Sequence, residues 1–158
     1  MPSGLSRRRL ASWAVGACLP GWVFAQSAAK KSAPLVQVWK DPNCGCCKDW
    51  VTHLERSGFR TQLFETGNNA VRSRLGLPQR YASCHTALVD GYVIEGHVPA
   101  SDIRRLLQEH PKALGLAVPR MPVGAPGMDG PAYGGRQDPF DVLLVALDGT
   151  ATVYQRHA

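Results

Sequence analysis

The chain has 158 residues, enough for one domain of ordinary size with a hydrophobic core. Its formal charge at pH 7 is +6, from 18 basic and 12 acidic residues. Three of the basic residues, Arg7, Arg8 and Arg9, lie in a predicted leader, and without them 15 basic residues face 12 acidic ones, a net charge of +3. The remaining Lys and Arg are scattered along the chain, so the charge gives little support to nucleic-acid binding.

Residues 1–25 have the parts of a secretory signal peptide. The basic residues 7–9 precede an apolar run over 10–19, and small residues stand before an expected cleavage site after Ala25. The apolar run is shorter than the roughly 20 residues that a membrane-spanning helix needs. We therefore expect residues 1–25 to be removed and the mature protein to lie outside the cytoplasm.

Two features of the leader leave the export route open. Residues 6–10 resemble a twin-arginine signal, which would mean export after folding or cofactor loading. Residues 15–18 resemble a lipobox, and lipidation of Cys18 would attach the protein to a membrane. We expect plain cleavage, and membrane attachment only in the lipidated case.

The expected mature chain begins with a linker and continues as one domain over residues 35–158. Residues 26–34 are small and polar, which is typical of a flexible linker. The β-branched and aromatic content of residues 35–40 predicts a strand. Apolar residues at three- and four-residue steps predict a helix over 45–57, ended by Gly58.

The later elements complete an α/β pattern. They are a strand over 60–65, a helix over 68–75, a loop and strand over 81–89, a hairpin partner over 92–96, a helix that opens at Pro99, and a final hairpin over 140–147 and 151–155. The order β-α-β-α-β-β-α with an added C-terminal β-hairpin predicts a thioredoxin-like fold. A Gly- and Pro-rich loop is expected over 115–139, and a loop of this length is either functional or disordered.

Three cysteines stand within four residues at the predicted turn from the first strand to the first helix. They are Cys44, Cys46 and Cys47, and Cys84 lies just before the third strand. Four cysteines in an exported protein can form two structural disulfides. Adjacent and next-but-one cysteines, however, close very small loops that constrain little chain. The spacing therefore favours redox or metal chemistry.

The positions of these thiols leave two chemistries open. Cys44 sits at the helix N-terminus, where free amide hydrogens and the helix dipole favour a thiolate, and with Cys47 it forms a C-x-x-C pair typical of disulfide exchange. Cys46 points about 100° away from Cys47 around the helix, so an exchanger does not require it, whereas a soft-metal site could use it. In a thioredoxin order the Cys84 loop lies against this helix N-terminus. Four thiolates together select Cu(I) or zinc.

Other side chains near these positions are weaker candidates for metal binding. His85 follows Cys84 and is interpreted either as a metal ligand or as a hydrogen-bonded histidine at the strand end. His97 is expected to be an ordinary strand-end histidine, and His53 is expected to be solvated and too far along the helix to share an ion. Met121 and Met128, on the long loop, are secondary ligand candidates.

Four motifs of the chain resemble the periplasmic copper-resistance proteins of the CopG type. They are residues 44–47 (Cys-Gly-Cys-Cys), 83–87, 91–100 and 115–119. The resemblance implies a thioredoxin-like fold, a periplasmic location, bound cuprous ions and a suspected role in copper redox interconversion. The ligands it implies are Cys44, Cys46, Cys47 and Cys84. Arg120 departs from the family's pattern, in which glycine is expected before Met-Pro.

We therefore expect an exported protein that binds one or more Cu(I) ions for copper tolerance and interconverts Cu(I) and Cu(II). Metal binding is expected rather than enzymatic turnover. The expected partners are copper ions and other periplasmic copper-handling proteins. The alternative is a periplasmic thiol–disulfide oxidoreductase that acts on proteins through Cys44 and Cys47. A third interpretation is a protein whose cysteines form only structural disulfides.

Overall fold

The computed structural model describes residues 32–158. The predicted signal peptide (residues 1–25), Cys18 and most of the predicted linker (residues 26–34) lie outside the described residues. Within the described part of the chain, no helix is both long enough and apolar enough to cross a membrane.

Seven strands and three α-helices follow one another within residues 32–158. The strands are β1 (Leu35–Lys40), β2 (Arg60–Phe64), β3 (His85–Val89), β4 (Tyr92–Glu95), β5 (Gly115–Ala117), β6 (Phe140–Val145) and β7 (Ala151–His157). The helices are α1 (Gly45–Arg56), α2 (Asn69–Arg74) and α3 (Ala100–Glu109), and single-turn 3₁₀ helices cover Gln79–Tyr81 and Pro131–Tyr133. The predicted α/β order with a C-terminal β-hairpin is confirmed.

The strands form one sheet in the order β2-β1-β3-β4-β5-β6-β7. β1 pairs parallel with β2 and antiparallel with β3, and β5 joins β4 to the final hairpin by pairing parallel with β4 and antiparallel with β6. The prediction of a loop over residues 115–139 was therefore wrong for Gly115–Ala117. A three-residue strand carries too short a pattern to be recognised, and this strand forms because both of its edges find partners.

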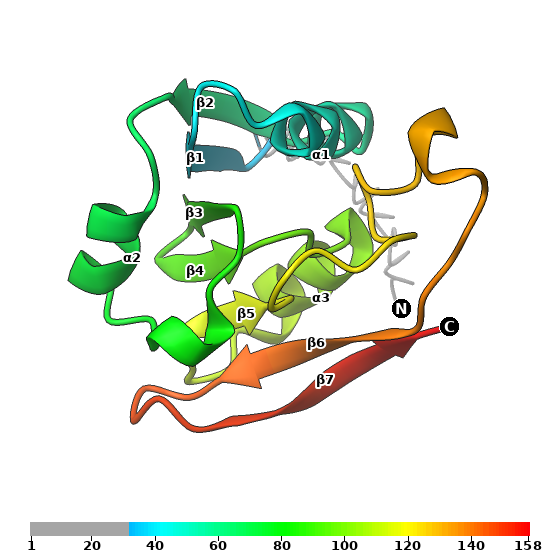
Figure 1. The fold of residues 1–158 in the computed structure, drawn as a ribbon. Helices are drawn as coiled ribbons and strands as arrows, with labels where there is room; N and C mark the ends of the chain where they lie inside the picture. Colours follow the sequence, from blue (N-terminus) through cyan, green and yellow to red (C-terminus); the bar gives the residue numbers. More distant parts are fainter. Residues whose placement is uncertain (1–31) are drawn as a thin grey trace, which may run out of the picture. The chain divides into compact units, whose positions relative to one another are not determined.

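The helices cover the sheet from both faces (Figure 1). α1 and α3 pack on one face, where they bury the main hydrophobic core, and α2 with the chain that follows it lies on the other face. The fully buried side chains of the main core include Val36, Val38, Trp50, Leu54, Ile103 and Leu106. This arrangement brings the first turn of α1 next to the starting end of β3.

The turn residues behave as the sequence predicts. Gly58 has φ +84° just after α1, the left-handed conformation in which glycine ends a helix. Asp90 and Gly91 have φ +48° and +83°, as a two-residue type I′ hairpin turn requires. The boundaries of α1, α2 and β2 lie within one residue of the predicted ones.

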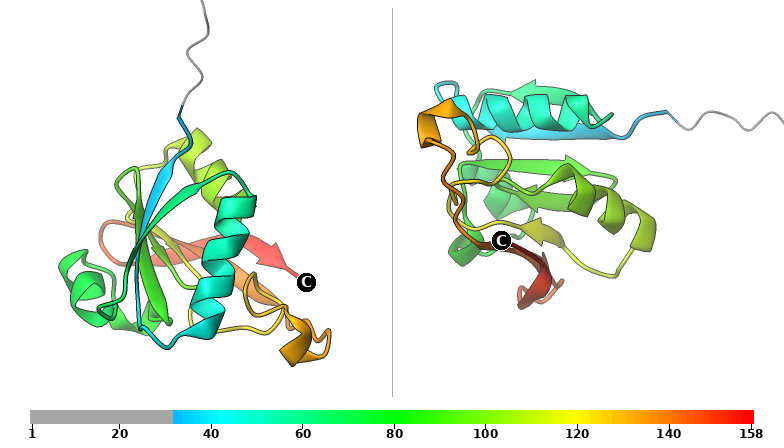
Figure 2. Two further views of the ribbon diagram at one scale, coloured as in Figure 1. Left: turned by 90° about the horizontal axis from the view of Figure 1, so that it is seen from above. Right: turned by 90° about the vertical axis from the view of Figure 1, so that its right-hand side faces the viewer.

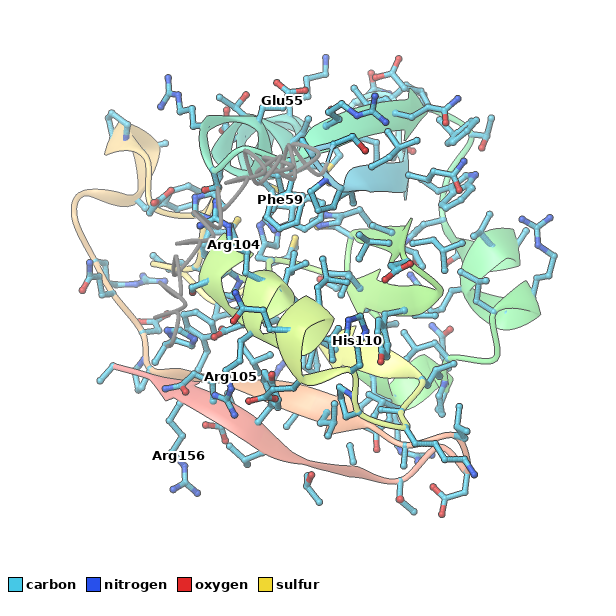
Figure 3. All side chains as sticks on the ribbon, turned by 180° about the vertical axis from the view of Figure 1, so that it is seen from behind. Glu55, Phe59, Arg104, Arg105, His110 and Arg156 are labelled. Atoms are coloured by element: carbon cyan, nitrogen blue, oxygen red, sulfur yellow. A yellow bond between two sulfur atoms is a disulfide. The ribbon has the colours of Figure 1, made fainter. Side chains whose placement is uncertain are left out.

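Two arginines of α3, Arg104 and Arg105, contact aromatic rings at the two edges of the sheet (Figure 3). The Arg104 guanidinium lies 5.6 Å from the centre of the Phe59 ring, just before β2, and the Arg105 guanidinium lies 4.0 Å from the centre of the Tyr154 ring in β7. Such cation–π contacts add about 0.5–1 kcal/mol each at exposed sites. The added hairpin is therefore tied to α3 as well as to the sheet.

Candidate metal centre

The turn that carries the three clustered cysteines is held by a buried ammonium. Lys40, at the end of β1, is fully buried, and its Nζ donates to the Asp41 carbonyl at 2.8 Å and pairs with the Glu65 carboxylate at 3.0 Å. The Asp41 side chain accepts the Asn43 N–H at 2.8 Å, and the Asp41 carbonyl accepts the Cys44 N–H at 3.1 Å. These bonds bring Cys44 to the N-cap position of α1.

The four predicted thiol ligands come together. The sulfur atoms of Cys44, Cys46, Cys47 and Cys84 all lie within 4.8 Å of one another. Cys44 and Cys47 form a disulfide, and the Cys46 sulfur lies 3.6 Å from that of Cys44. Cys46 therefore joins the cluster although it leaves the helix about 100° from Cys47. Cys46 and Cys84 are free, half-buried thiols.

Cys84 also belongs to a second group of candidate metal ligands. Its sulfur lies 3.3 Å from Nδ1 of His85 and 3.1 Å from Nε2 of His97, and the three ligand atoms lie within 4.8 Å of one another. Burial, and then the neighbouring Cys46, raise the pKa of Cys84 to about 12. The thiol is therefore protonated at neutral pH, and a soft cation must displace that proton to bind.

His97 is the residue that the sequence-based prediction missed. It is fully buried rather than an ordinary strand-end side chain, and its Nδ1 lies 2.8 Å from the Pro126 carbonyl. Because a carbonyl only accepts, Nδ1 carries the proton and the Nε2 lone pair faces Cys84. Metal-binding histidines usually donate their second ring N–H in this way. Burial lowers the pKa of His97, so its neutral form is favoured.

His85 lies where the prediction placed it, beside Cys84. Its ring is fully buried, with its centre 4.2 Å from the centre of the Trp50 ring. Burial and the neighbouring His97 lower its pKa well below the ordinary value. Among the described residues its Nε2 has no hydrogen-bond partner. Its role as a secondary metal ligand stays a prediction.

The two methionines occupy different environments. Met128 is buried, and its sulfur accepts a hydrogen bond from the Tyr133 hydroxyl at 3.2 Å. Met121 is 48% exposed and lines a groove of about 770 Å³ beside β6 and β7 whose lining contains none of the four clustered cysteines. Their roles as secondary ligands stay predictions.

His53 is not the solvated residue that the sequence suggested. It is half-buried, and its Nε2 accepts the Ala100 N–H at 3.1 Å. The imidazole thus satisfies one of the free amide groups of the first turn of α3. Its position in the last turn of α1 keeps it out of both groups of candidate metal ligands, as expected.

The loop that carries Pro126 lies against the first turn of α1 (Figure 2). Gly127 has φ +84°, and a Cβ there would lie 2.6 Å from the Cys46 carbonyl oxygen and 2.7 Å from the Trp50 nitrogen. Only glycine allows this approach. The loop therefore closes over the helix end and holds Pro126 where His97 can reach it.

Replacing Gly127 by alanine is expected to lower the free energy of unfolding by about 1–3 kcal/mol, because the new Cβ meets helix backbone and φ is positive. Urea denaturation of the two proteins measures the difference. Gly130→Ala is the matched control, since a Cβ at Gly130 meets nothing within 4 Å. Equal stability of the two variants would contradict the close approach of the loop to α1.

Comparison with known proteins finds a family match and solved structures of similar fold. Residues 81–128 match a family described as "Protein of unknown function, DUF411", and no curated protein matches. A solved structure described as copper resistance protein CopG, Form 2, is 46% identical, with a TM-score of 0.73, and the match covers 80% of this chain and 99% of the other. Form 1 of the same protein is 46% identical with a TM-score of 0.72, over 78% and 96%. The chain belongs to the family of CopG copper resistance proteins.

Proposed function

We propose that the mature protein binds copper as Cu(I) outside the cytoplasm and serves copper tolerance. The observation that carries the proposal is the meeting of four cysteine sulfurs within 4.8 Å. Thiolates are soft ligands that select Cu(I), and the solved relatives are described as copper resistance proteins. Bridging sulfurs would let the cluster hold one ion or more. Other periplasmic copper-handling proteins would deliver or receive the metal.

The imidazoles extend this proposal to both oxidation states of copper. Cys84 belongs to the thiol group and also to the group with His85 and His97, and imidazole nitrogen suits copper as well as zinc. Two Cu(II) ions can each take one electron from the Cys44 and Cys47 thiols, which then form their disulfide and release two protons. The Cys44–Cys47 disulfide is the oxidised product of that step. Copper reduction and thiol oxidation would thus be coupled.

The same disulfide favours a second candidate function. A Cys44–Cys47 pair at the N-terminus of α1 has the arrangement of a thiol–disulfide oxidoreductase that acts on proteins. This alternative needs neither Cys46 nor Cys84. Cys46 therefore discriminates between the two functions.

Cys46→Ser is expected to weaken Cu(I) binding by about tenfold or more, because it removes one of four thiolates. The reduced exported protein and the variant are titrated with Cu(I) against a chromogenic chelator of known affinity, which gives both stoichiometry and affinity. Thr52→Ala, at an exposed position of α1, is the control. Unchanged Cu(I) binding together with retained insulin reductase activity in Cys46→Ser would favour the oxidoreductase.

A further inference from the structure

The loop before β3 decides where the Cys84 sulfur lies, and no proline stiffens it. Ser83 is the residue that the rest of the protein holds. Its N–H donates to Oε1 of Glu95 at 2.7 Å, and its carbonyl accepts from a terminal nitrogen of Arg72 at 2.9 Å. Asn68 donates to the same carbonyl at 3.2 Å. Both polar backbone groups of the residue next to Cys84 are therefore fixed.

Glu95 and Arg72 also bind each other. Arg72 Nε donates to Glu95 Oε1 at 2.9 Å, and the two side chains are 2% and 0% exposed. The second carboxylate oxygen accepts the Thr86 hydroxyl at 2.6 Å. The pair thus holds the chain on both sides of Cys84, from the face of the sheet opposite α1.

Two further hydrogen bonds of Arg72 go to residues of its own neighbourhood. Its other terminal nitrogen donates to Asn69 at 2.8 Å and to Gln79 at 3.3 Å. The guanidinium plane therefore has one orientation, fixed by α2 and the chain after it. A fork of this kind delivers several directed hydrogen bonds that a lysine ammonium cannot reproduce.

Stability alone gives little reason for such a pair. Buried ion pairs often add nothing to the free energy of unfolding relative to apolar side chains of similar volume, while removal of one partner is strongly destabilising. A buried pair that binds both backbone groups of one loop residue fixes the geometry of that loop instead.

We propose that Arg72 and Glu95 are positioning residues that hold the Cys84 thiol within reach of the cysteines on α1. Their effect is exerted through Ser83 and Thr86, and neither residue belongs to the two groups of candidate ligands. The consequence for copper rests on the proposed function, whereas the placement of the thiol does not. The proposal is therefore tested first by a measurement that uses no metal.

That measurement is the effective concentration of Cys46 and Cys84 toward each other, whose sulfurs lie within 4.8 Å. In a parent with Cys44→Ser and Cys47→Ser, the equilibrium between the Cys46–Cys84 disulfide and a glutathione redox buffer reports how well the loop holds Cys84. The double replacement Arg72→Met with Glu95→Gln removes both charges, so that no lone buried charge remains. We expect its effective concentration to fall by about tenfold or more, while its urea midpoint stays close to that of the parent.

Two further variants complete the test. Arg72→Lys keeps the charge but lacks the fork, and we expect a lower effective concentration in a folded protein. Arg105→Gln with Glu109→Gln removes an ion pair whose side chains are 43% and 46% exposed, and it should leave the value unchanged. A parent-like effective concentration in the double variant, or in Arg72→Lys if the double variant does not fold, would overturn the proposal.

Cu(I) titration of the same replacements in the otherwise native protein completes the experiment. We expect weaker Cu(I) binding in the double variant and unchanged binding in the Arg105/Glu109 control. If the native protein itself does not bind Cu(I), the proposed copper-binding function is wrong. The glutathione equilibrium still decides whether Arg72 and Glu95 position the thiol.

Discussion

Cys84→Ser is expected to lower the affinity of the reduced protein for Cu(I) by at least about a hundredfold. Loss of a residue that only hydrogen-bonds to a metal ligand lowers metal affinity by about 10–100-fold. Cys84 is itself a proposed ligand, so its loss should have a larger effect. It is also the one side chain shared by the four-thiol group and the group with His85 and His97. Its replacement should therefore weaken binding more than Cys46→Ser does.

Competition with a chromogenic Cu(I) chelator measures this difference, and Ser101→Ala, at an exposed position of α3, serves as the control. Equal affinities of Cys84→Ser and the native protein would rule out the four-thiol site. Loss of binding no greater than in Cys46→Ser would show that the histidine group adds nothing to the metal site.

The pH dependence of binding supplies a second readout for Cys84. Burial raises the pKa of this thiol to about 12, so it remains protonated from pH 6 to pH 9 and must release its proton to a bound metal. Cu(I) affinity therefore rises with pH, by about tenfold per pH unit for this one group. In Cys84→Ser the serine hydroxyl stays protonated, so binding releases about one proton fewer. A plot of the logarithm of Cu(I) affinity against pH should therefore have a slope smaller by about one.

The parts of the fold that could be predicted from the sequence depend on local chemistry. Gly58 ends α1 and Asp90–Gly91 forms a tight turn because only a few residue types tolerate positive φ. The spacing of Cys44, Cys46 and Cys47 likewise places three thiols at one helix end whatever the rest of the chain does. The order of elements and the grouping of these three thiols follow from signals of this kind. Cys84 joins them because β3 pairs with β1, which places His85 opposite Lys40.

The parts that could not be predicted depend on contacts between distant residues. His97 faces Cys84 because the Pro126 carbonyl, 29 positions along the chain, holds its Nδ1 proton. In the sequence, Glu95 is an ordinary polar residue at a strand end, and only the fold places Arg72 of α2 against it. β5 exists because β4 and β6 pair with it. Neither spacing nor residue type along the chain indicates these partners.

The core and the candidate metal centre meet at Trp50, three positions after Cys47 on α1. Trp50 is fully buried, and its indole N–H donates to the Val98 carbonyl at 2.9 Å. Its ring lies against His85, with the ring centres 4.2 Å apart. The same side chain therefore fills the core and forms one wall beside the proposed site.

Trp50→Ala is expected to lower the free energy of unfolding by about 3–5 kcal/mol, because it opens a large cavity and leaves the buried Val98 carbonyl without its donor. Trp50→Phe keeps an aromatic ring over His85 and loses chiefly the hydrogen bond, so we expect a smaller loss of about 1–3 kcal/mol. Urea denaturation of the metal-free, reduced proteins measures both. A ligand that binds only the folded state raises the free energy of unfolding in proportion to the logarithm of ligand concentration over Kd. Because Trp50→Phe keeps the ring beside His85, added Cu(I) should stabilise this variant nearly as much as the native protein. A loss below 1 kcal/mol in Trp50→Ala would contradict the position of this ring between core and site.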